Sequence, residues 1–265
     1  MKKVSLIEIV SKRFPETHRD ILYARIMCGE VLVKGEKISN PSTKVSIDSE
    51  IIIVEKKFVS RGGLKLDAAL DEWNITTNGK IILDAGSSTG GFTDCLLKRG
   101  ARMVHAVDVG YNQLAYSLRT DTRVNVLEKC NIMHLEELTP PPDSAVADLS
   151  FRSISGAARH IINLTTEKWL IALVKPQFEI DTQKYLDFTG IIREKSILRN
   201  VLNGVLKKID NDKLFVERVM LSPVKGRKGN TEFLFLIRDN QTEIAKPLWM
   251  EQIGQELDDL IDSIT

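Results

Sequence analysis

The segment "DAGSSTGGFTD", residues 84–94, is the part of the sequence that best indicates the class of fold. It follows the apolar run "KIIL" (80–83) and leads into "CLLKRG" (95–100). This order predicts a short buried strand, a glycine loop, and a helix that begins in the loop. Because glycine carries no side chain, such a loop lets a ligand approach the backbone closely.

The chain after residue 63 alternates between apolar strand-like runs and helical segments. Helices are expected near 64–73, 91–99, 112–119, 153–164 and 194–209, and strands at 80–84, 103–108, 124–128, 144–150, 169–175, 214–222 and 231–238. This alternation predicts an α/β fold, a parallel sheet with helices on both faces. The last two strands are separated only by "PVKGRKGN" (223–230), which is too short for a parallel crossover. We therefore expect an antiparallel final hairpin, as in Rossmann-like methyltransferases and unlike a dehydrogenase.

The first 55 residues have the pattern of a small α+β domain. Two short helical segments precede "VLVKGEKIS" (31–39), which indicates a hairpin turning at Lys34-Gly35. A further strand is indicated by "SEIIIVE" (49–55). We expect an RNA-binding domain at 1–55, a linker at 56–63, a methyltransferase domain at 64–238 and an acidic C-terminal tail at 239–265.

Charge is distributed unevenly along the chain, although the formal net charge is only +1. Residues 1–58 carry 11 Lys or Arg against 8 Asp or Glu, whereas residues 239–265 carry 1 Lys against 7 acids. A basic front segment suits a polyanionic partner such as RNA, although the same charges also fit an ordinary solvated surface. The RNA-binding residues we expect are Arg19, Arg25, Lys34, Lys37 and Arg61.

Several classes of protein are disfavoured by the composition. Cys28, Cys95 and Cys130 lack the close spacing of metal ligands, so we expect reduced thiols and no bound metal. The N-terminal apolar stretch is too short for a secretion signal, and no run reaches the ~18 apolar residues of a membrane span. The expected location is the cytoplasm.

Polar residues stand at or near the carboxyl ends of four of the predicted parallel strands: Asp84, Asp108, Asp148 and Lys175. In open α/β sheets these carboxyl ends meet in one crevice, where ligands bind. A single acid at such a place is commonly a turn or capping residue. Four converging ends favour a binding site.

The residues of the glycine loop distinguish three ligands: a nucleotide, a nicotinamide cofactor and S-adenosylmethionine. A phosphate-binding loop needs lysine where Phe92 stands, and the dinucleotide fingerprint needs glycine where Ser88 stands. Asp84 would repel a pyrophosphate but suits the ammonium group of S-adenosylmethionine. Asp108, 24 residues further on, suits ribose hydroxyl groups. We therefore expect S-adenosylmethionine, held by Asp84, Gly86, Ser87, Thr89, Gly90, Gly91, Phe92, Asp108 and Asn131.

A series of motifs resembles those of one known family. They are "SRGGLKL" (60–66), "DAGSSTGGFTDCLLKRGA" (84–101), "AVDVGYNQL" (106–114), "DLSF" (148–151), "VKPQFE" (174–179) and "SPVKGRKGNTEF" (222–233). In this order they are similar to the TlyA family, whose members are named haemolysins or rRNA 2′-O-methyltransferases with an FtsJ-like catalytic domain. "ARIMCGEVLVKGEKI" (24–38) resembles the S-four type of RNA-binding domain. The resemblance implies methylation of a cytidine ribose in ribosomal RNA.

The resemblance also implies a catalytic tetrad, Lys65, Asp148, Lys175 and Glu232. A ribose 2′-hydroxyl is a poor nucleophile until a base takes its proton. A lysine can be that base only where burial or a nearby cation disfavours its charged form. Lys175 ends the apolar strand "WLIALVK", so we expect it to be the base. Lys65 is then the second cation, and the two acids orient the ammonium groups, with Asp148 placed to hold that of Lys175.

Other functions remain compatible with parts of the sequence. A pore-forming haemolysin would need a secretion signal and a membrane segment, and a non-catalytic ribosome-assembly factor would not need the glycine loop. "DLSF" also resembles the D/N-P-P-Y element of amino methyltransferases, where an aromatic residue stacks on a flipped base. Leu149 and Ser150 replace both of its prolines. The leading expectation is an rRNA 2′-O-methyltransferase that acts on ribosomal RNA or a ribosomal subunit, without a membrane or an obligate protein partner.

Overall fold

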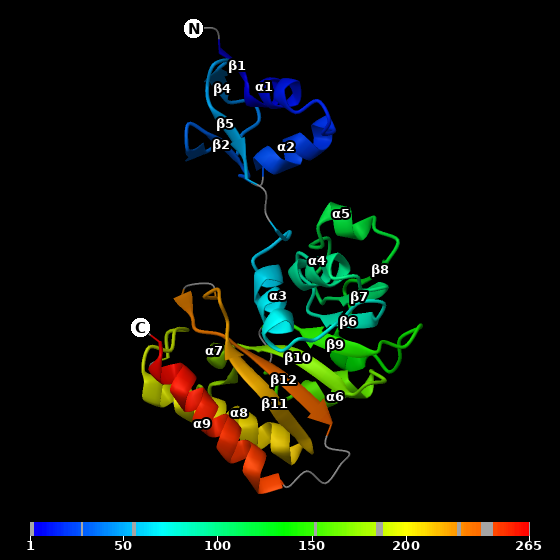
Figure 1. Cartoon of the computed structure of the whole chain (residues 1–265), viewed down its shortest axis with the longest axis vertical. Helices are drawn as coiled ribbons and strands as arrows, with labels where there is room; N and C mark the ends of the chain where they lie inside the picture. The colour runs from blue at the N-terminus through cyan, green and yellow to red at the C-terminus, as the bar shows by residue number, and fades with distance from the viewer. Residues whose placement is uncertain are drawn as a thin grey trace. The chain divides into compact units, whose positions relative to one another are not determined.

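The computed structural model describes residues 3–27, 29–54, 57–150, 153–183, 188–226, 229–239 and 246–264. The chain divides into two compact units, Met1–Lys57 and Phe58–Thr265 (Figure 1). The boundary falls inside the segment 56–63 that we expected as a linker. The last residues of that segment are helical, because helix α3 begins at Gly62.

The described residues of the first unit form two helices and two small sheets. The helices are α1 (Leu6–Arg13) and α2 (Arg19–Met27), and the strands are β1 (Lys3–Ser5), β2 (Val31–Val33), β3 (Glu36–Lys37), β4 (Lys44–Ser46) and β5 (Ile51–Ile53). β1 pairs with β4, and β3, β2 and β5 form an antiparallel sheet in that order. The expected turn at Lys34-Gly35 joins β2 to β3, with positive φ at both residues. Aliphatic side chains from both helices and from β2 form the core.

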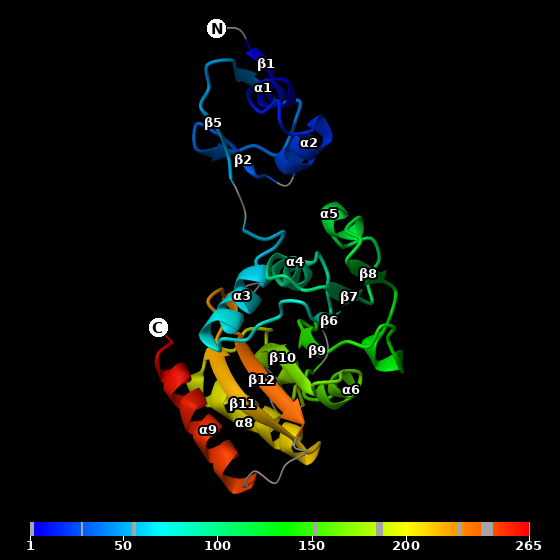
Figure 2. The same ribbon diagram turned by 45° about the vertical axis from the view of Figure 1, so that its right-hand side comes forward.

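The second unit is built on a seven-stranded sheet (Figure 1, Figure 2). Its strands are β6 (Ile81–Ala85), β7 (Met103–Val107), β8 (Val124–Leu127), β9 (Ser144–Ala147), β10 (Trp169–Val174), β11 (Leu214–Leu221) and β12 (Phe233–Asp239). They lie in the order β11-β12-β10-β9-β6-β7-β8. Strands β6 to β10 run parallel, and β12 is antiparallel to both β10 and β11. The predicted fold, a mostly parallel sheet with an antiparallel final hairpin, is therefore confirmed.

Helices cover both faces of this sheet. They are α3 (Gly62–Glu72), α4 (Gly91–Lys98), α5 (Tyr116–Arg119), α6 (Ala158–Asn163), α7 (Pro176–Glu179), α8 (Lys195–Asn211), α9 (Lys246–Asp262) and the 3-10 helix Ile132–His134. One apolar layer joins the sheet to α3 and α4, and the other joins it to α6, α8 and α9. Successive strand residues alternate between the layers, as Ile82 and Leu83 do, because side chains of a strand point to opposite faces.

Two helices begin later than the sequence pattern predicts, and in both cases a distant glutamate holds the preceding backbone. A helix was expected near 112–119, but α5 begins at Tyr116 because Glu128 accepts hydrogen bonds from the N–H groups of residues 112–114. A helix was expected near 153–164, but α6 begins at Ala158. There the N–H group of Ile154 donates to Glu179 at 2.6 Å.

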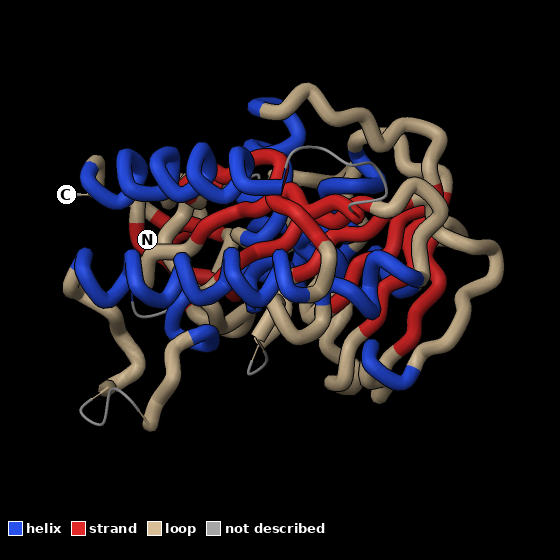
Figure 3. The backbone as a smooth tube through the Cα atoms, turned by 90° about the horizontal axis from the view of Figure 1, so that it is seen from below, coloured by secondary structure: helices blue, strands red, loops and turns tan. Residues whose placement is uncertain are grey.

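The acidic C-terminal segment contains helix α9, which packs on β11 and lies beside α8 (Figure 3). Arg199 of α8 forms ion pairs with Asp258 at 2.9 Å and with Asp262 at 2.5 Å. Some of the acidic residues of the C-terminal segment therefore form ion pairs with the neighbouring helix α8. Within the described ranges, no helix is long and apolar enough to cross a membrane.

Candidate active site

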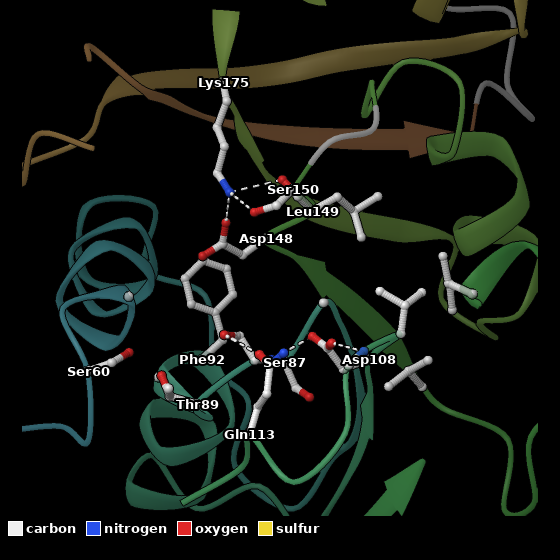
Figure 4. A pocket seen from close by; sticks show the side chains of 18 of the residues that line it. Ser60, Ser87, Thr89, Phe92, Asp108, Gln113, Asp148, Leu149, Ser150 and Lys175 are labelled. Carbon is white, nitrogen blue, oxygen red and sulfur yellow. Dashed lines mark hydrogen bonds and ion pairs between the residues drawn. The ribbon is translucent and has the colours of Figure 1, made fainter. Parts of the chain in front are cut away.

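A cavity of about 720 Å³ lies at the carboxyl ends of the parallel strands (Figure 4). Its volume falls within the range of pockets that enclose small organic ligands. Its lining includes residues named from the sequence, which are Arg61, Lys65, Gly86, Ser87, Thr89, Gly91, Phe92, Asp108, Asn131, Asp148, Lys175 and Glu232. Asp84 and Gly90 are both buried and are not part of the lining. The fold therefore gathers segments from residue 60 to residue 232 around one space.

Lys175 and Asp148 form an ion pair inside this cavity. The lysine Nζ lies 2.6 Å from Oδ1 of Asp148. It also donates to the backbone oxygen of Leu149 at 2.9 Å and to the hydroxyl oxygen of Ser150 at 3.1 Å (Figure 4). Since β9 and β10 are adjacent parallel strands, the residues that follow them meet at the same edge. The loop after β9 thus surrounds the lysine ammonium group with oxygen acceptors.

Lys65 and Glu232 form the second ion pair of the cavity. The lysine lies near the start of α3, and the glutamate directly precedes β12, yet Lys65 Nζ donates to Glu232 Oε2. Both side chains are buried, with exposed fractions of 10% and 4%. The four residues of the expected tetrad therefore line one cavity as two pairs. From the sequence, Asp148 was expected to hold the ammonium group of Lys175, whereas the pairing of Lys65 with Glu232 was not predicted.

The glycine loop packs closely against the segments that carry these pairs. Gly86 has a φ of +85°, and a Cβ atom there would lie 2.7 Å from the backbone oxygen of Asp148. A Cβ atom at Gly91 would lie 2.9 Å from the backbone nitrogen of Gly63, at the start of α3. We expected these glycines to admit a ligand, and the structure gives them an additional role. Gly86 lets the loop after β6 approach the loop after β9, and Gly91 lets the start of α4 approach the start of α3.

Asp108 fixes the backbone on both sides of the cavity's rim. Its Oδ2 accepts a hydrogen bond from the N–H of Ser88 at 2.8 Å, and its Oδ1 accepts one from the N–H of Gly110 at 2.6 Å. The following residues 112–114 are held by Glu128. Burial alone would raise the pKa of Glu128, but hydrogen bonds from those backbone N–H groups and from Arg119 lower it to about 2. Glu128 therefore stays ionised at neutral pH, and the two carboxylates together hold the backbone of the rim.

Asp84 is placed differently from the other expected cofactor residues. It is fully buried within β6, its Oδ2 accepts a hydrogen bond from the Thr93 hydroxyl at 2.6 Å, and its Oδ1 has no hydrogen-bond partner. Burial raises the pKa of Asp84 to about 7, and the nearby Asp148 and Asp108 carboxylates act in the same direction. From the sequence we expected Asp84 to face the crevice. The structure instead shows a buried carboxyl whose ionised form is disfavoured.

The raised pKa of Asp84 leads to a prediction about the pH dependence of stability. A carboxyl whose pKa is raised on folding stabilises the fold fully below about pH 4, and that contribution is lost as the pH rises through about 7. Asp84→Asn removes this titration. The free energy of unfolding of the variant minus that of the wild type should therefore increase by roughly 2–3 kcal/mol from pH 5 to pH 8. Denaturant unfolding at both pH values measures this, and an equal difference at the two values would contradict it.

Several cavity residues were missed by sequence reasoning. They are Ser60, Gln113, Leu149, Ser150, Gln177 and Phe178. All lie inside the quoted motifs, but we selected charged residues and the glycine loop, and these side chains are mostly uncharged hydrogen-bonding or apolar groups. The other expected RNA-binding residues lie in the first unit, where Arg19 and Arg25 are on α2 and Lys34 and Lys37 are in the β2–β3 hairpin. Among the described residues, no cluster of His, Cys, Asp or Glu is placed to hold a metal ion.

The reversed strand β12 and the cavity at the carboxyl edge define a Rossmann-like methyltransferase fold. The FtsJ-like methyltransferase family matches residues 58–238. Hemolysin A of Brachyspira hyodysenteriae is 41% identical over 217 residues, which are 79% of this chain and 89% of that protein. The 16S/23S rRNA (cytidine-2′-O)-methyltransferase TlyA of Mycobacterium tuberculosis is 37% identical over 226 residues, 83% of this chain and 84% of that protein.

A solved structure of a hemolysin-named protein from Streptococcus thermophilus aligns with a TM-score of 0.70 and 31% identity, covering 99% of this chain and 98% of that one. A second, from Lactococcus lactis, aligns with a TM-score of 0.67 and 39% identity, covering 77% and 99%. This chain belongs to the FtsJ-like methyltransferases and, among them, to the family of TlyA and the proteins named haemolysins.

Proposed function

We propose that this protein transfers a methyl group from S-adenosylmethionine to the ribose 2′-hydroxyl of a cytidine in ribosomal RNA. The observation that carries the proposal is the pair of ion pairs, Lys175–Asp148 and Lys65–Glu232, in one cavity beside the glycine loop. The TlyA relatives from Mycobacterium tuberculosis and Campylobacter jejuni, named as rRNA (cytidine-2′-O)-methyltransferases, support the substrate. A ribosomal substrate would place the protein in the cytoplasm.

The residues of the cavity fit S-adenosylmethionine. Each oxygen of Asp108 accepts one backbone hydrogen bond and keeps a second lone pair for a ribose hydroxyl. Ile132 and Leu149 supply apolar surface for a purine ring. A nearby cationic ligand would favour the ionised form of Asp84, whose Oδ1 has no hydrogen-bond partner. When bound, the cofactor supplies a methyl group on a positively charged sulfur.

The side chains of this cavity would then move one proton and hold the reacting groups. Lys175, once neutral, accepts the proton of the 2′-hydroxyl through its Nζ atom. Asp148, together with the acceptors on Leu149 and Ser150, fixes the direction of that atom. The Lys65–Glu232 pair holds the start of α3 against the start of β12 and keeps a second positive charge in the cavity.

Cofactor affinity should depend on Asp108. Asp108→Ala removes a charge-assisted contact to ribose worth roughly 1.5–3 kcal/mol, so the dissociation constant should rise about ten- to hundredfold. Asp108→Asn keeps one carbonyl oxygen and should lose less affinity. Titration calorimetry with S-adenosylmethionine measures both, and thermal unfolding checks that the fold is retained. Unchanged affinity in the alanine variant would refute this role of Asp108.

RNA affinity should depend on the basic residues of the first unit. In the full chain, the triple substitution Arg19→Ala, Lys34→Ala and Lys37→Ala removes three cations, all on exposed residues. Binding to rRNA should weaken, and the slope of log K against log salt should become shallower by about 0.7 for each lost phosphate contact. Cofactor affinity should stay the same. An unchanged salt slope would show that these residues do not contact phosphate.

The proposed reaction is tested directly by incubating the protein with rRNA and S-adenosylmethionine labelled in the methyl group. The RNA is then digested to nucleosides, which are separated and identified by mass. We expect the label in 2′-O-methylcytidine. Label in a base-methylated nucleoside, or in none, would overturn the proposal.

A further inference from the structure

Glu179 joins helix α7 to the loop after β9, the two segments that form the Lys175 side of the cavity. Helix α7 begins directly after Lys175 and ends at Glu179. The Glu179 carboxylate accepts hydrogen bonds from the Ser153 hydroxyl at 2.5 Å, the Ile154 N–H at 2.6 Å and the Ser155 hydroxyl at 3.1 Å. All three donors lie in the loop between β9 and α6. The carboxylate thus fastens that loop to α7.

Lys175 joins the same two segments, but by contacts that its proposed role must disturb. Its Nζ atom touches Asp148, Leu149 and Ser150, which begin the loop after β9. A base that turns toward a substrate hydroxyl exchanges some of these contacts for the new one. The hydrogen bonds of Glu179 do not involve the lysine, so they persist during this exchange.

Helix α7 also carries two residues of the cavity wall. Gln177 and Phe178 both line the cavity, and the Nζ atom of Lys175 lies 5.7 Å from the centre of the Phe178 ring. A shift of α7 relative to the loop after β9 would therefore move one wall of the cavity and the lysine together. Misplacement of a reacting group by about 1 Å can cost on the order of a hundredfold in rate.

We propose that Glu179 is a positioning residue for methyl transfer: by fastening residues 153–155 to α7, it keeps Lys175 aligned with Asp148 and with the substrate hydroxyl. This inference rests on the proposed function. It assigns Glu179 no contact with the cofactor or the RNA. Its effect should appear in the rate of the chemical step rather than in binding.

Glu179→Gln tests the proposal, because glutamine keeps the side-chain length but replaces one acceptor oxygen with an amide NH₂ group. We expect the single-turnover rate on rRNA to fall at least tenfold, with cofactor affinity and RNA affinity within twofold of the wild type. Replacing both serine donors instead, in Ser153→Ala/Ser155→Ala, should lower the rate in the same direction.

A matched control is Glu167→Gln. Glu167 also accepts hydrogen bonds from two side chains, those of Lys80 and Trp169, but at the amino-terminal ends of β6 and β10. This variant should transfer methyl groups at the wild-type rate. A rate loss equal to that of Glu179→Gln would show a general loss of fold and would overturn the proposal.

Coupling to Lys175 separates positioning from a merely structural role. If Glu179 acts through the lysine, Glu179→Gln should cause no further loss of rate in a Lys175→Ala background. A further loss of the full size, an unchanged rate in the single variant, or an effect on RNA affinity alone would each overturn the inference. Failure of the wild type to methylate rRNA would overturn the proposed function itself, and this inference with it.

Discussion

Lys175→Ala is expected to slow methyl transfer by about 10²–10⁴-fold, the usual loss on removing a general base. The side chain is only 12% exposed and ends among the acceptors Asp148, Leu149 and Ser150, inside the proposed cofactor cavity. Cofactor and RNA binding should survive, because other residues provide them. Single-turnover rates with labelled S-adenosylmethionine, alongside calorimetry, measure both properties on the same preparation.

Lys175→Arg is the matched variant, because it keeps the positive charge near Asp148 but cannot give up a proton at neutral pH. If the lysine is the base, the arginine variant should be as inactive as the alanine variant. Near-wild-type turnover with arginine would show that the residue only holds the substrate, and the assignment of the base would be wrong.

Lys65→Ala should have the largest effect on stability. It leaves Glu232 without its cation at a site where the carboxylate side chain is 4% exposed. Breaking a buried ion pair by removing one partner costs about 3–5 kcal/mol. We therefore expect a loss of that size in the free energy of unfolding, measured in denaturant, together with a loss of methyl transfer.

The double variant Lys65→Met/Glu232→Gln separates these two losses. Replacing both partners removes the uncompensated charge, so most of the lost stability should return. Activity should not return, because the second cation of the cavity is still missing. A double variant that regained activity would show that the pair serves the fold alone. A stable Lys65→Ala variant would show that Glu232 does not depend on the lysine.

The sheet could be predicted from sequence because each of its strands is a separate apolar run. Its final hairpin followed from the length of residues 223–230, which allows no crossover. The starts of α5 and α6 could not be predicted in the same way. They are set by Glu128 and Glu179, which accept hydrogen bonds from backbone N–H groups 16 and 25 residues away. Local helix propensity does not depend on such distant contacts, so it could not predict them.

The sequence indicated many of the residues that line the cavity, but not how all of them pair or how deeply they are buried. Strand ends and motifs named Lys175 and Asp148, and the parallel pairing of β9 with β10 then brings them together. Pairing of Lys65 with Glu232 joins positions 167 residues apart, and only the folded sheet shows it. The burial of Asp84 was not predicted, because the sequence pattern of an acid at a strand end is the same whether its side chain faces the cavity or the core.

Mapping of 2′-O-methylation on ribosomal RNA by mass spectrometry can show whether this protein methylates rRNA in the cell and whether Lys175 is required. The RNA should come from cells that contain the protein, from cells that lack it, and from cells that contain only Lys175→Ala. We expect a methylated cytidine ribose in the first sample and an unmethylated one at the same position in the other two. The same ribose methylation in all three samples would contradict the claim that this protein is an rRNA 2′-O-methyltransferase.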